Sequence, residues 1–310
     1  MKKREPIVKS PTRPEAEAHL RGSLPARPVA SHKGSFGRAH LFAGSPTYTG
    51  AALLSAEGAL RMGVGLTYLY TTKSAADAAR ARLPELIITE TSPAAAGGAD
   101  ILRLALGCEG AILLGPGLGQ SDADGNPVDP TRFCELLSAL LSHAGGPVVL
   151  DADALNLLSR GTPDAAALLR ASVREVVITP HPTEFARLFG RKPAPSTDDR
   201  IVCATIFAAN SGATVLLKGR GTVIASPDGR ATVNPSGGSA LAKGGSGDVL
   251  AGMLTALIAE GMPAYDAACA AAYLHGAAGD TLATTLSDYG VLPSELPIAA
   301  ARELARILGE

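Results

Sequence analysis

The sequence is poor in several features that mark particular classes of protein. No tryptophan occurs among its 310 residues, so its own near-ultraviolet absorbance is low. No apolar run reaches the length of about 18 residues that suggests a membrane-spanning helix. The basic N-terminus, MKKREP, is not followed by the apolar stretch of a secretory signal. The formal net charge of −1 gives no general attraction to nucleic acid or to a membrane surface.

Cysteine is also scarce. The four cysteines lie far apart, at positions 108, 134, 203 and 269. Since no two of them form a CxxC pair, the sequence contains no metal or redox motif of that kind. This spacing is typical of free thiols in a reducing compartment, and it predicts a cytoplasmic protein.

Apolar segments of strand length alternate with alanine- and leucine-rich segments at helical spacing along most of the chain. Continuous apolar strands separated by helices imply a parallel sheet with helices on both faces. We therefore predict an α/β fold with a mostly parallel central sheet. The strand-like runs are residues 39–44, 65–71, 85–90, 110–115, 147–153, 175–180 and 213–219.

The two ends of the chain depart from this alternation. Residues 1–30 contain five prolines and scattered charge, which predicts an extended tail, ordered at most in part, ahead of one domain over residues 31–310. Residues 222–226 and 231–235 flank the turn sequence PDGR, which predicts a β-hairpin. The remaining predicted helices cover residues 246–260, 263–284 and 294–308.

Glycine and polar residues cluster immediately after five of the predicted strands. The clusters are GSPTYTG, GPGLG, DAD, TPHPTE and KGRGT. In open α/β sheets, ligands bind outside the carboxyl ends of the strands. Any one cluster could be ordinary turn chemistry, but five at one edge predict a single long binding cleft.

Residues 244–251, GGSGDVLA, join a glycine-rich loop to an apolar helical run. The loop is not a Walker A motif, which needs Lys and Ser or Thr after the last glycine, and it is not GxGxxG. Ser246 or Asp248 could simply cap the helix. Alternatively, the loop N–H groups hold a phosphoryl group while Asp248 acts as a base on a substrate hydroxyl.

Six segments, taken in order, resemble the NAD(P)H-hydrate dehydratases, which are metabolite-repair enzymes with a ribokinase-like fold. The resemblance runs from about residue 31 to the C-terminus and implies a ribokinase-like three-layer α/β/α fold. It also implies dehydration of the S epimer of NAD(P)H hydrate, in which ADP phosphorylates the ring hydroxyl, AMP is released and phosphate is eliminated. The segments are GSFGRAHLFAGSPTYTGAA, GPGLG, LDADALN, TPHPTEF, LLKGRGT and NPSGGSALAKGGSGDVLAG.

The resemblance implies roles for particular residues. Asp248 is the catalytic base and also contacts the substrate, and Gly245 and Gly247 belong to the catalytic anion hole. Three residues contact the hydrated cofactor, namely Ala51, Gly117 and His181. Two segments bind the nucleotide, and they comprise Lys218, Gly219, Arg220, Gly221 and Thr222, and Gly244, Gly245, Ser246 and Gly247.

Structural alternatives remain open for several of these segments. KGRGT could be a strand that ends in a β-turn. Glu184 either holds Mg²⁺ through water, by analogy with the Asn-x-x-Glu of ribokinase-like kinases, or interacts with the helix dipole from the first turn. Asp151 and Asp153 either bind a metal, or one of them caps the next helix. His275 and Asp280 are predicted to pack or to line the nucleotide pocket.

The resemblance further implies Mg²⁺, ADP as co-substrate with ATP as the alternative donor, and a homotetramer or larger assembly. The substrates are the hydrates NADHX and NADPHX. The roughly 30 residues of the tail are too few for the epimerase domain that many bacterial relatives carry in front. A separate NAD(P)H-hydrate epimerase is therefore predicted as functional partner.

One other class of enzyme shares the GxGD signature. This alternative is a ribokinase-like kinase of a small alcohol, such as a hydroxymethylpyrimidine or a hydroxyethylthiazole. Such a kinase is not expected to carry GSxxYTGAA, TPHPTE and KGRGT together.

Overall fold

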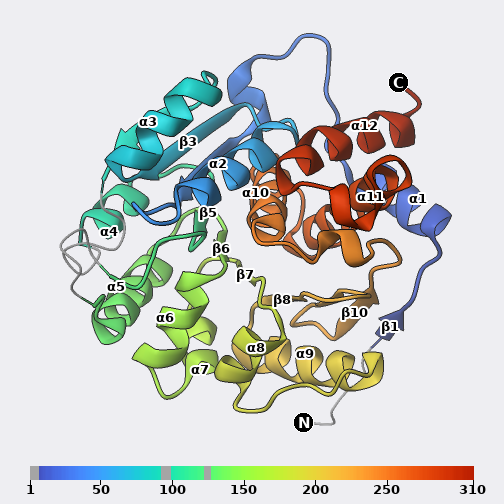
Figure 1. Ribbon diagram of the computed structural model, residues 1–310. Coiled ribbons are helices and arrows are strands. Elements are labelled where there is room, and N and C mark those ends of the chain that lie inside the picture. The colour runs from blue at the N-terminus through green and yellow to red at the C-terminus, as the bar shows by residue number, and fades with distance from the viewer. Residues whose placement is uncertain (1–6, 92–98, 122–126) are drawn as a thin grey trace.

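Ten strands form one mixed sheet through the middle of the computed structural model, and helices cover both of its faces (Figure 1). The structure describes residues 7–91, 99–121 and 127–310. The strand order is β1-β10-β9-β8-β7-β6-β5-β2-β3-β4. The strands are β1 (Ile7–Lys9), β2 (Arg38–Phe42), β3 (Leu66–Thr71), β4 (Ile87–Glu90), β5 (Ala111–Leu114), β6 (Val148–Leu150), β7 (Val176–Ile178), β8 (Thr214–Leu217), β9 (Val223–Ala225) and β10 (Arg230–Val233).

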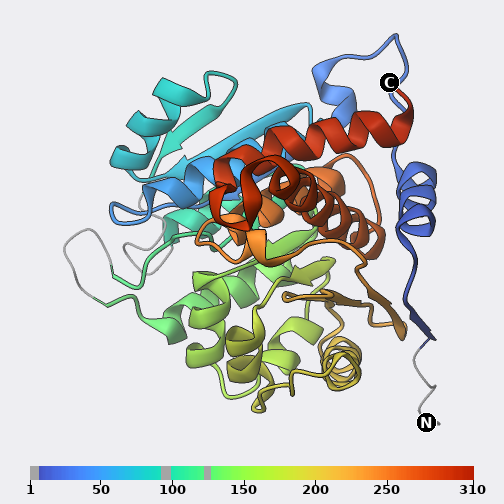
Figure 2. The same cartoon turned by 45° about the vertical axis from the view of Figure 1, so that its right-hand side comes forward.

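The helices form two layers. Helices α1, α2, α3, α10, α11 and α12 pack on one face of the sheet, and α4 to α9 pack on the other (Figure 2). None of the helices in the described ranges is both long and apolar enough to cross a bilayer. Their bounds are α1 (Arg13–Ser23), α2 (Thr49–Leu60), α3 (Lys73–Arg82), α4 (Ala99–Leu106), α5 (Pro130–Ser142), α6 (Asp153–Gly161), α7 (Ala165–Arg170), α8 (Pro182–Phe189), α9 (Thr197–Ser211), α10 (Ser246–Ala259), α11 (Ala264–Gly290) and α12 (Leu296–Leu308).

The central strands are buried on both faces, which explains their unbroken apolar sequences. In β6, Val148 and Leu150 point into the core beneath α5 and α6, while Val149 points into the core beneath α10 and α11. All three side chains are fully buried, and burying one such side chain contributes about 1.5–3 kcal/mol. The predicted three-layer α/β fold is confirmed.

The sheet is parallel except at one strand. Among the described strands, only β9 pairs in the antiparallel sense, with β8 and with β10. The predicted hairpin and the mostly parallel sheet are both confirmed. Because β2 and β5 to β8 all run in the same direction, their carboxyl ends lie along one edge of the sheet.

The N-terminal segment is more ordered than the sequence predicted. Instead of an extended tail, residues 7–23 contain a strand that pairs with β10 and an eleven-residue helix, α1. At the start of the helix, the Thr12 N–H and the Thr12 hydroxyl both donate to the Glu15 carboxylate, at 2.7 Å and 2.8 Å. Pro14 lies in the first turn, where its missing N–H costs nothing. Residues 1–6 of the predicted tail lie outside the described residues.

Candidate functional site

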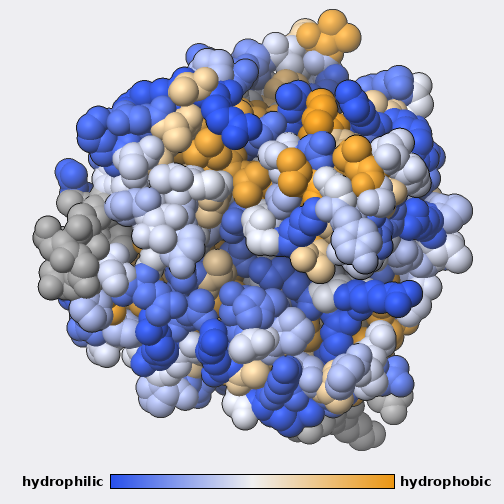
Figure 3. Space-filling model, in the orientation of Figure 1, coloured by the Kyte–Doolittle hydropathy of each residue, from blue (hydrophilic) through white to orange (hydrophobic). Residues whose placement is uncertain are grey.

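The five predicted polar clusters meet at the carboxyl edge of the sheet. They follow β2, β5, β6, β7 and β8. The glycine-rich loop before α10 lies at the same edge, on the side of the helix layer that contains α2 and α10. Figure 3 shows a polar hollow in this face, between the part of the surface over α2 and α10 and the part over α6 and α8. Three of the clusters and the loop before α10 are linked to one another by side-chain contacts.

A partly buried ion pair, with Asp151 on its buried side, lies at the centre of this edge. The Lys218 ammonium lies 2.8 Å from Asp151 Oδ1, and the Thr179 hydroxyl donates to the same oxygen over 2.7 Å. The ammonium also lies beside Gly247, where a Cβ would be 3.3 Å away. Burial disfavours the ammonium, but the charges of Asp151 and Glu184 outweigh this effect and raise the pKa of Lys218. The pair therefore connects the segments after β6, β7 and β8 with the loop before α10.

Asp248 faces this ion pair from the first turn of α10. The N-cap of α10 is Gly245, at φ 99°, and no side chain caps the helix, so Asp248 is not the capping residue. Burial, followed by the nearby charge of Asp151, raises the pKa of Asp248 to about 7, although the Lys218 ammonium opposes the rise. A carboxylate with this pKa can accept a proton near neutral pH.

His275 supports the start of α10 from α11. Its Nε2 lies 2.9 Å from the Ser246 carbonyl oxygen and 3.1 Å from the Ser246 hydroxyl. Burial lowers the pKa of His275 to about 4, so the ring is neutral and Nε2 donates to the carbonyl. The sequence predicted packing or pocket lining for His275. Its direct contact with Ser246 was not predicted, because 29 residues separate the two.

His181 and Glu184 form a capping box at the start of α8. His181 Nδ1 accepts from the N–H groups of Thr183 at 3.1 Å and Glu184 at 3.4 Å. The two Glu184 oxygens contact the His181 N–H at 2.9 Å and its Nε2 at 3.1 Å. Burial would raise the pKa of Glu184, but the His181 hydrogen bond and the Lys218 charge hold it below its usual value.

Glu184 therefore lies in the first turn of α8, the position that its structural alternative predicted. Each oxygen of its carboxylate has one partner, the His181 N–H or the His181 ring. Among the residues that the structure describes, no three or more His, Cys, Asp or Glu side chains are grouped to hold a metal.

The GPGLG segment lies against the start of α2. A Cβ at Gly117, which has φ 58°, would lie 2.6 Å from the Cβ of Ala51, so this close approach requires glycine. Asp153 accepts the Gly119 N–H at 2.9 Å, and Asp151 holds Lys218. Neither carboxylate caps α6, whose N-cap is Ala152. The capping alternative for these two aspartates was therefore wrong.

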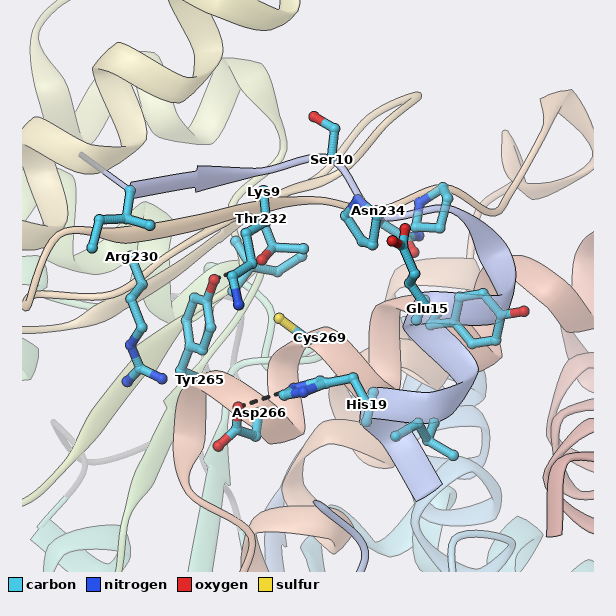
Figure 4. A pocket seen from close by; sticks show the side chains of 18 residues that line it. Lys9, Ser10, Glu15, His19, Arg230, Thr232, Asn234, Tyr265, Asp266 and Cys269 are labelled. Atoms are coloured by element: carbon cyan, nitrogen blue, oxygen red, sulfur yellow. Dashed lines mark hydrogen bonds and ion pairs between the residues drawn. The ribbon is translucent and has the colours of Figure 1, made fainter. Parts of the chain in front are cut away.

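Of two cavities among the described residues, one touches the predicted site and the other does not. A cavity of about 250 Å³ is lined by Gly50 and Gly244, among other residues. A cavity of about 480 Å³ lies beneath the N-terminal segment, which contributes Lys9, Glu15 and His19 to its lining (Figure 4). Tyr265 and Asp266 line it from α11, and the His19 ring contacts Asp266 at 3.1 Å. None of the predicted site residues lines the larger cavity.

Polar loops at the carboxyl edge of a mostly parallel sheet, with a glycine-rich helix start that carries a carboxylate, define a ribokinase-like protein. The solved structure of a ribokinase-like superfamily protein from Enterococcus faecalis aligns with a TM-score of 0.77 and 27% identity. The alignment covers 98% of this chain and 97% of that one.

The family can be stated more closely. The family model for NAD(P)H-hydrate dehydratase matches residues 39–300, and the chain belongs to this family. The ADP-dependent (S)-NAD(P)H-hydrate dehydratase of Neisseria meningitidis is 39% identical over 89% of this chain and 87% of its own length. The crystal structure of the ADP/ATP-dependent NAD(P)H-hydrate dehydratase from Bacillus subtilis, co-crystallised with ATP/Mg²⁺, aligns with a TM-score of 0.76 and 33% identity. That alignment covers 94% of this chain and 97% of that one. The chain spans about half the length of the relatives described as bifunctional NAD(P)H-hydrate repair enzymes.

Proposed function

We propose that the chain catalyses the ADP-dependent dehydration of the S epimer of NAD(P)H hydrate, which restores NAD(P)H. The observation that carries the proposal is the position of Asp248. Its carboxylate, with a pKa of about 7, stands at a glycine-rich helix N-terminus beside the Lys218 ammonium. A base and a site for phosphoryl charge are thus adjacent, as a hydroxyl-phosphorylating enzyme requires.

The reaction has two steps in this proposal. The hydroxyl oxygen of the hydrate attacks the terminal phosphorus of ADP, the bond to AMP breaks, and Asp248 takes the hydroxyl proton. The ring carbon–oxygen bond then breaks, phosphate leaves with the electron pair, and a ring proton is lost as the double bond forms. The products are NAD(P)H, AMP and phosphate. A positioned general base typically contributes about 10²–10⁴-fold in rate.

Each segment has a distinct role in this proposal. The N–H groups of Gly245 to Gly247, together with the dipole of α10 and the Lys218 cation, stabilise the charge on the transferring phosphoryl group. Residues 218–222 and Gly244 bind the nucleotide. Ala51, Gly117 and His181 contact the hydrated nicotinamide.

We also propose that Mg²⁺ accompanies the nucleotide and offsets the charge of its phosphates. Magnesium keeps most of its waters and uses few protein ligands, which is compatible with a water-mediated contact to Glu184. The proposal includes action in the cytoplasm, as a homotetramer or larger assembly, beside a separate epimerase that interconverts the two hydrate epimers.

The test uses purified protein, chemically prepared NADH hydrate and Mg²⁺, with ADP or ATP in separate cuvettes. We expect near-ultraviolet absorbance of reduced nicotinamide to appear with nucleotide and not without it. Asp248→Asn should abolish this signal while nucleotide binding is kept. Nucleotide binding with no absorbance change from either donor would refute the proposal and favour phosphorylation of a different small alcohol.

A further inference from the structure

Arg200 is buried beneath the segment that follows β8. It belongs to the first turn of α9, and only 7% of the residue is exposed. Its guanidinium donates to three carbonyl oxygens of that segment, at Arg220 (2.7 Å), Leu217 (3.0 Å) and Lys218 (3.4 Å). One side chain thus fixes the orientation of three peptide groups in the predicted nucleotide segment.

The orientation of these carbonyl groups decides where the N–H groups point. In a trans peptide the N–H points opposite to the carbonyl of the same peptide group. Because the Lys218 and Arg220 carbonyls point toward Arg200, the N–H groups of Gly219 and Gly221 point away from it. Neither of these N–H groups has a hydrogen-bond acceptor anywhere in residues 7–91, 99–121 or 127–310.

The backbone of the segment leaves little freedom at Gly219. Gly219 has φ 145°, and a Cβ there would lie 3.0 Å from Arg200 Nη2. Free backbone N–H groups in such a loop form an anion-binding site, and a cation behind them adds to the attraction. The Lys218 side chain leaves the same segment toward Asp151 and Gly247, where we have placed the phosphoryl transfer.

We propose that Arg200 is a positioning residue that holds the Gly219 and Gly221 N–H groups ready to bind a phosphate of the nucleotide. The identification of this anion as a nucleotide phosphate rests on the proposed function. Arg200 itself does not touch the ligand, since its Nη1 and Nη2 groups are directed at the opposite side of the loop.

Arg174 offers a matched control. It is equally buried, with 6% of the residue exposed, and its guanidinium also donates to three carbonyls, those of His143 (2.8 Å), Gly146 (3.3 Å) and Ala144 (3.5 Å). The three acceptor residues precede β6, and Arg174 itself precedes β7. Arg174 therefore lies at the amino edge of the sheet, opposite the candidate site. A general loss of stability should therefore be common to both arginine variants, whereas a loss of nucleotide affinity should not.

The experiment compares Arg200→Met, Arg200→Lys and Arg174→Met by calorimetric titration with ADP and by steady-state kinetics. We expect Arg200→Met to raise the Kd and the KM for ADP by roughly tenfold or more, the effect of losing about one charge-assisted hydrogen bond. The KM for the hydrate should stay within about twofold, because only the nucleotide segment is disturbed. Arg200→Lys should lie between wild type and Arg200→Met, and added guanidinium ion should partly restore ADP affinity to Arg200→Met.

Two results would overturn the proposal. One is an Arg200→Met protein that binds ADP as wild type does, and the other is an equal loss of ADP affinity in Arg174→Met. If Arg200→Met does not fold, Arg200→Lys and Gly219→Ala carry the same comparison, because a Cβ at Gly219 displaces the guanidinium. A failure of the proposed function would look different from a failure of the Arg200 proposal. ADP would still bind in an Arg200-dependent manner, but no hydrate would be turned over.

Discussion

At the carboxyl edge, the pKa values of Lys218 and Asp248 depend on their charged neighbours. Desolvation of its carboxyl group and the nearby charge of Asp151 raise the pKa of Asp248 to about 7, while Lys218 limits the rise. The contribution of each neighbouring charge to the pKa of Asp248 can be removed by substitution. The pH dependence of turnover therefore tests the geometry of this cluster.

We expect kcat/KM to rise as the pH increases through about 7, because a carboxyl group with a raised pKa becomes a base only above that pH. Asp151→Asn removes a negative charge and should move this acidic limb to lower pH. Lys218→Met removes the opposing cation and should move it to higher pH. The measurement is kcat/KM against pH for the three proteins. A limb that stays in place in both variants would contradict the assignment of Asp248 as the base.

The raised pKa of Asp248 should support activity but lower the stability of the fold. Its folded pKa is raised to about 7 from 3.8, so its ionised form is disfavoured by folding and the protein loses stability as the pH rises between these values. Asp248→Asn removes this cost, and we expect it to stabilise the protein by on the order of 2 kcal/mol at pH 8. The gain should vanish near pH 4. Denaturant unfolding at the two pH values measures it, and an equal gain at both would exclude the ionisation as the cause.

At the scale of secondary-structure elements, α1 supports the segment that leads to the glycine-rich loop. Arg13 contacts Asp280 on α11, and Asp280 also accepts the Gly237 N–H at 2.9 Å. The Tyr273 hydroxyl donates to Glu17 at 2.7 Å. The Tyr273 carbonyl in turn accepts the neighbouring Ser236 hydroxyl at 2.8 Å. The N-terminal helix is therefore connected by two routes to the residues just ahead of the loop at residues 244–247.

We expect Asp280→Ala to be costly, because it leaves the Gly237 N–H without its acceptor. The loss should be about 1–3 kcal/mol in the free energy of unfolding, with a lower kcat because the following loop is less well held. Arg13→Ala is the control, since that half-exposed ion pair contributes under about 1 kcal/mol. Chemical unfolding and turnover at saturating substrates test both variants. Equal effects of the two substitutions would show that Gly237 does not depend on Asp280.

The whole molecule shows which parts of a fold a single sequence can predict. Strands buried on both faces, such as β6, have unbroken apolar sequences that identified the parallel sheet. The N-terminal helix was missed because its burial depends on α11 and α12, more than 200 residues away, although its Thr-x-x-Glu capping signal was present at Thr12. The sequence predicted that the site lies at the carboxyl edge of the sheet, but it did not predict which side chains contact one another there. Asp151 and Lys218 are 67 residues apart, and nothing in the polar start of α9 marked Arg200 as buried.

Nucleotide binding should stabilise the whole fold, because the proposed ligand contacts both layers. At a concentration of 100 times its Kd, ADP should add about 2.7 kcal/mol to the free energy of unfolding. Thermal unfolding with increasing ADP measures this effect, and Arg200→Met should need a higher ADP concentration for the same rise in Tm. A Tm that does not respond to ADP would show that the folded protein does not bind it.

The pairing of β1 with β10 sets an order of events during synthesis. Residues 7–9 find their partners only when residues 230–232 have left the ribosome, and α1 needs the still later α11 and α12. At about 5–20 residues per second, residues 7–23 wait roughly 10–60 s after their own synthesis before they can dock. Residues 7–23 are thus incorporated only after segments that are synthesised later, and we expect nascent chains stalled before residue 230 to be cleaved readily by protease within residues 7–23.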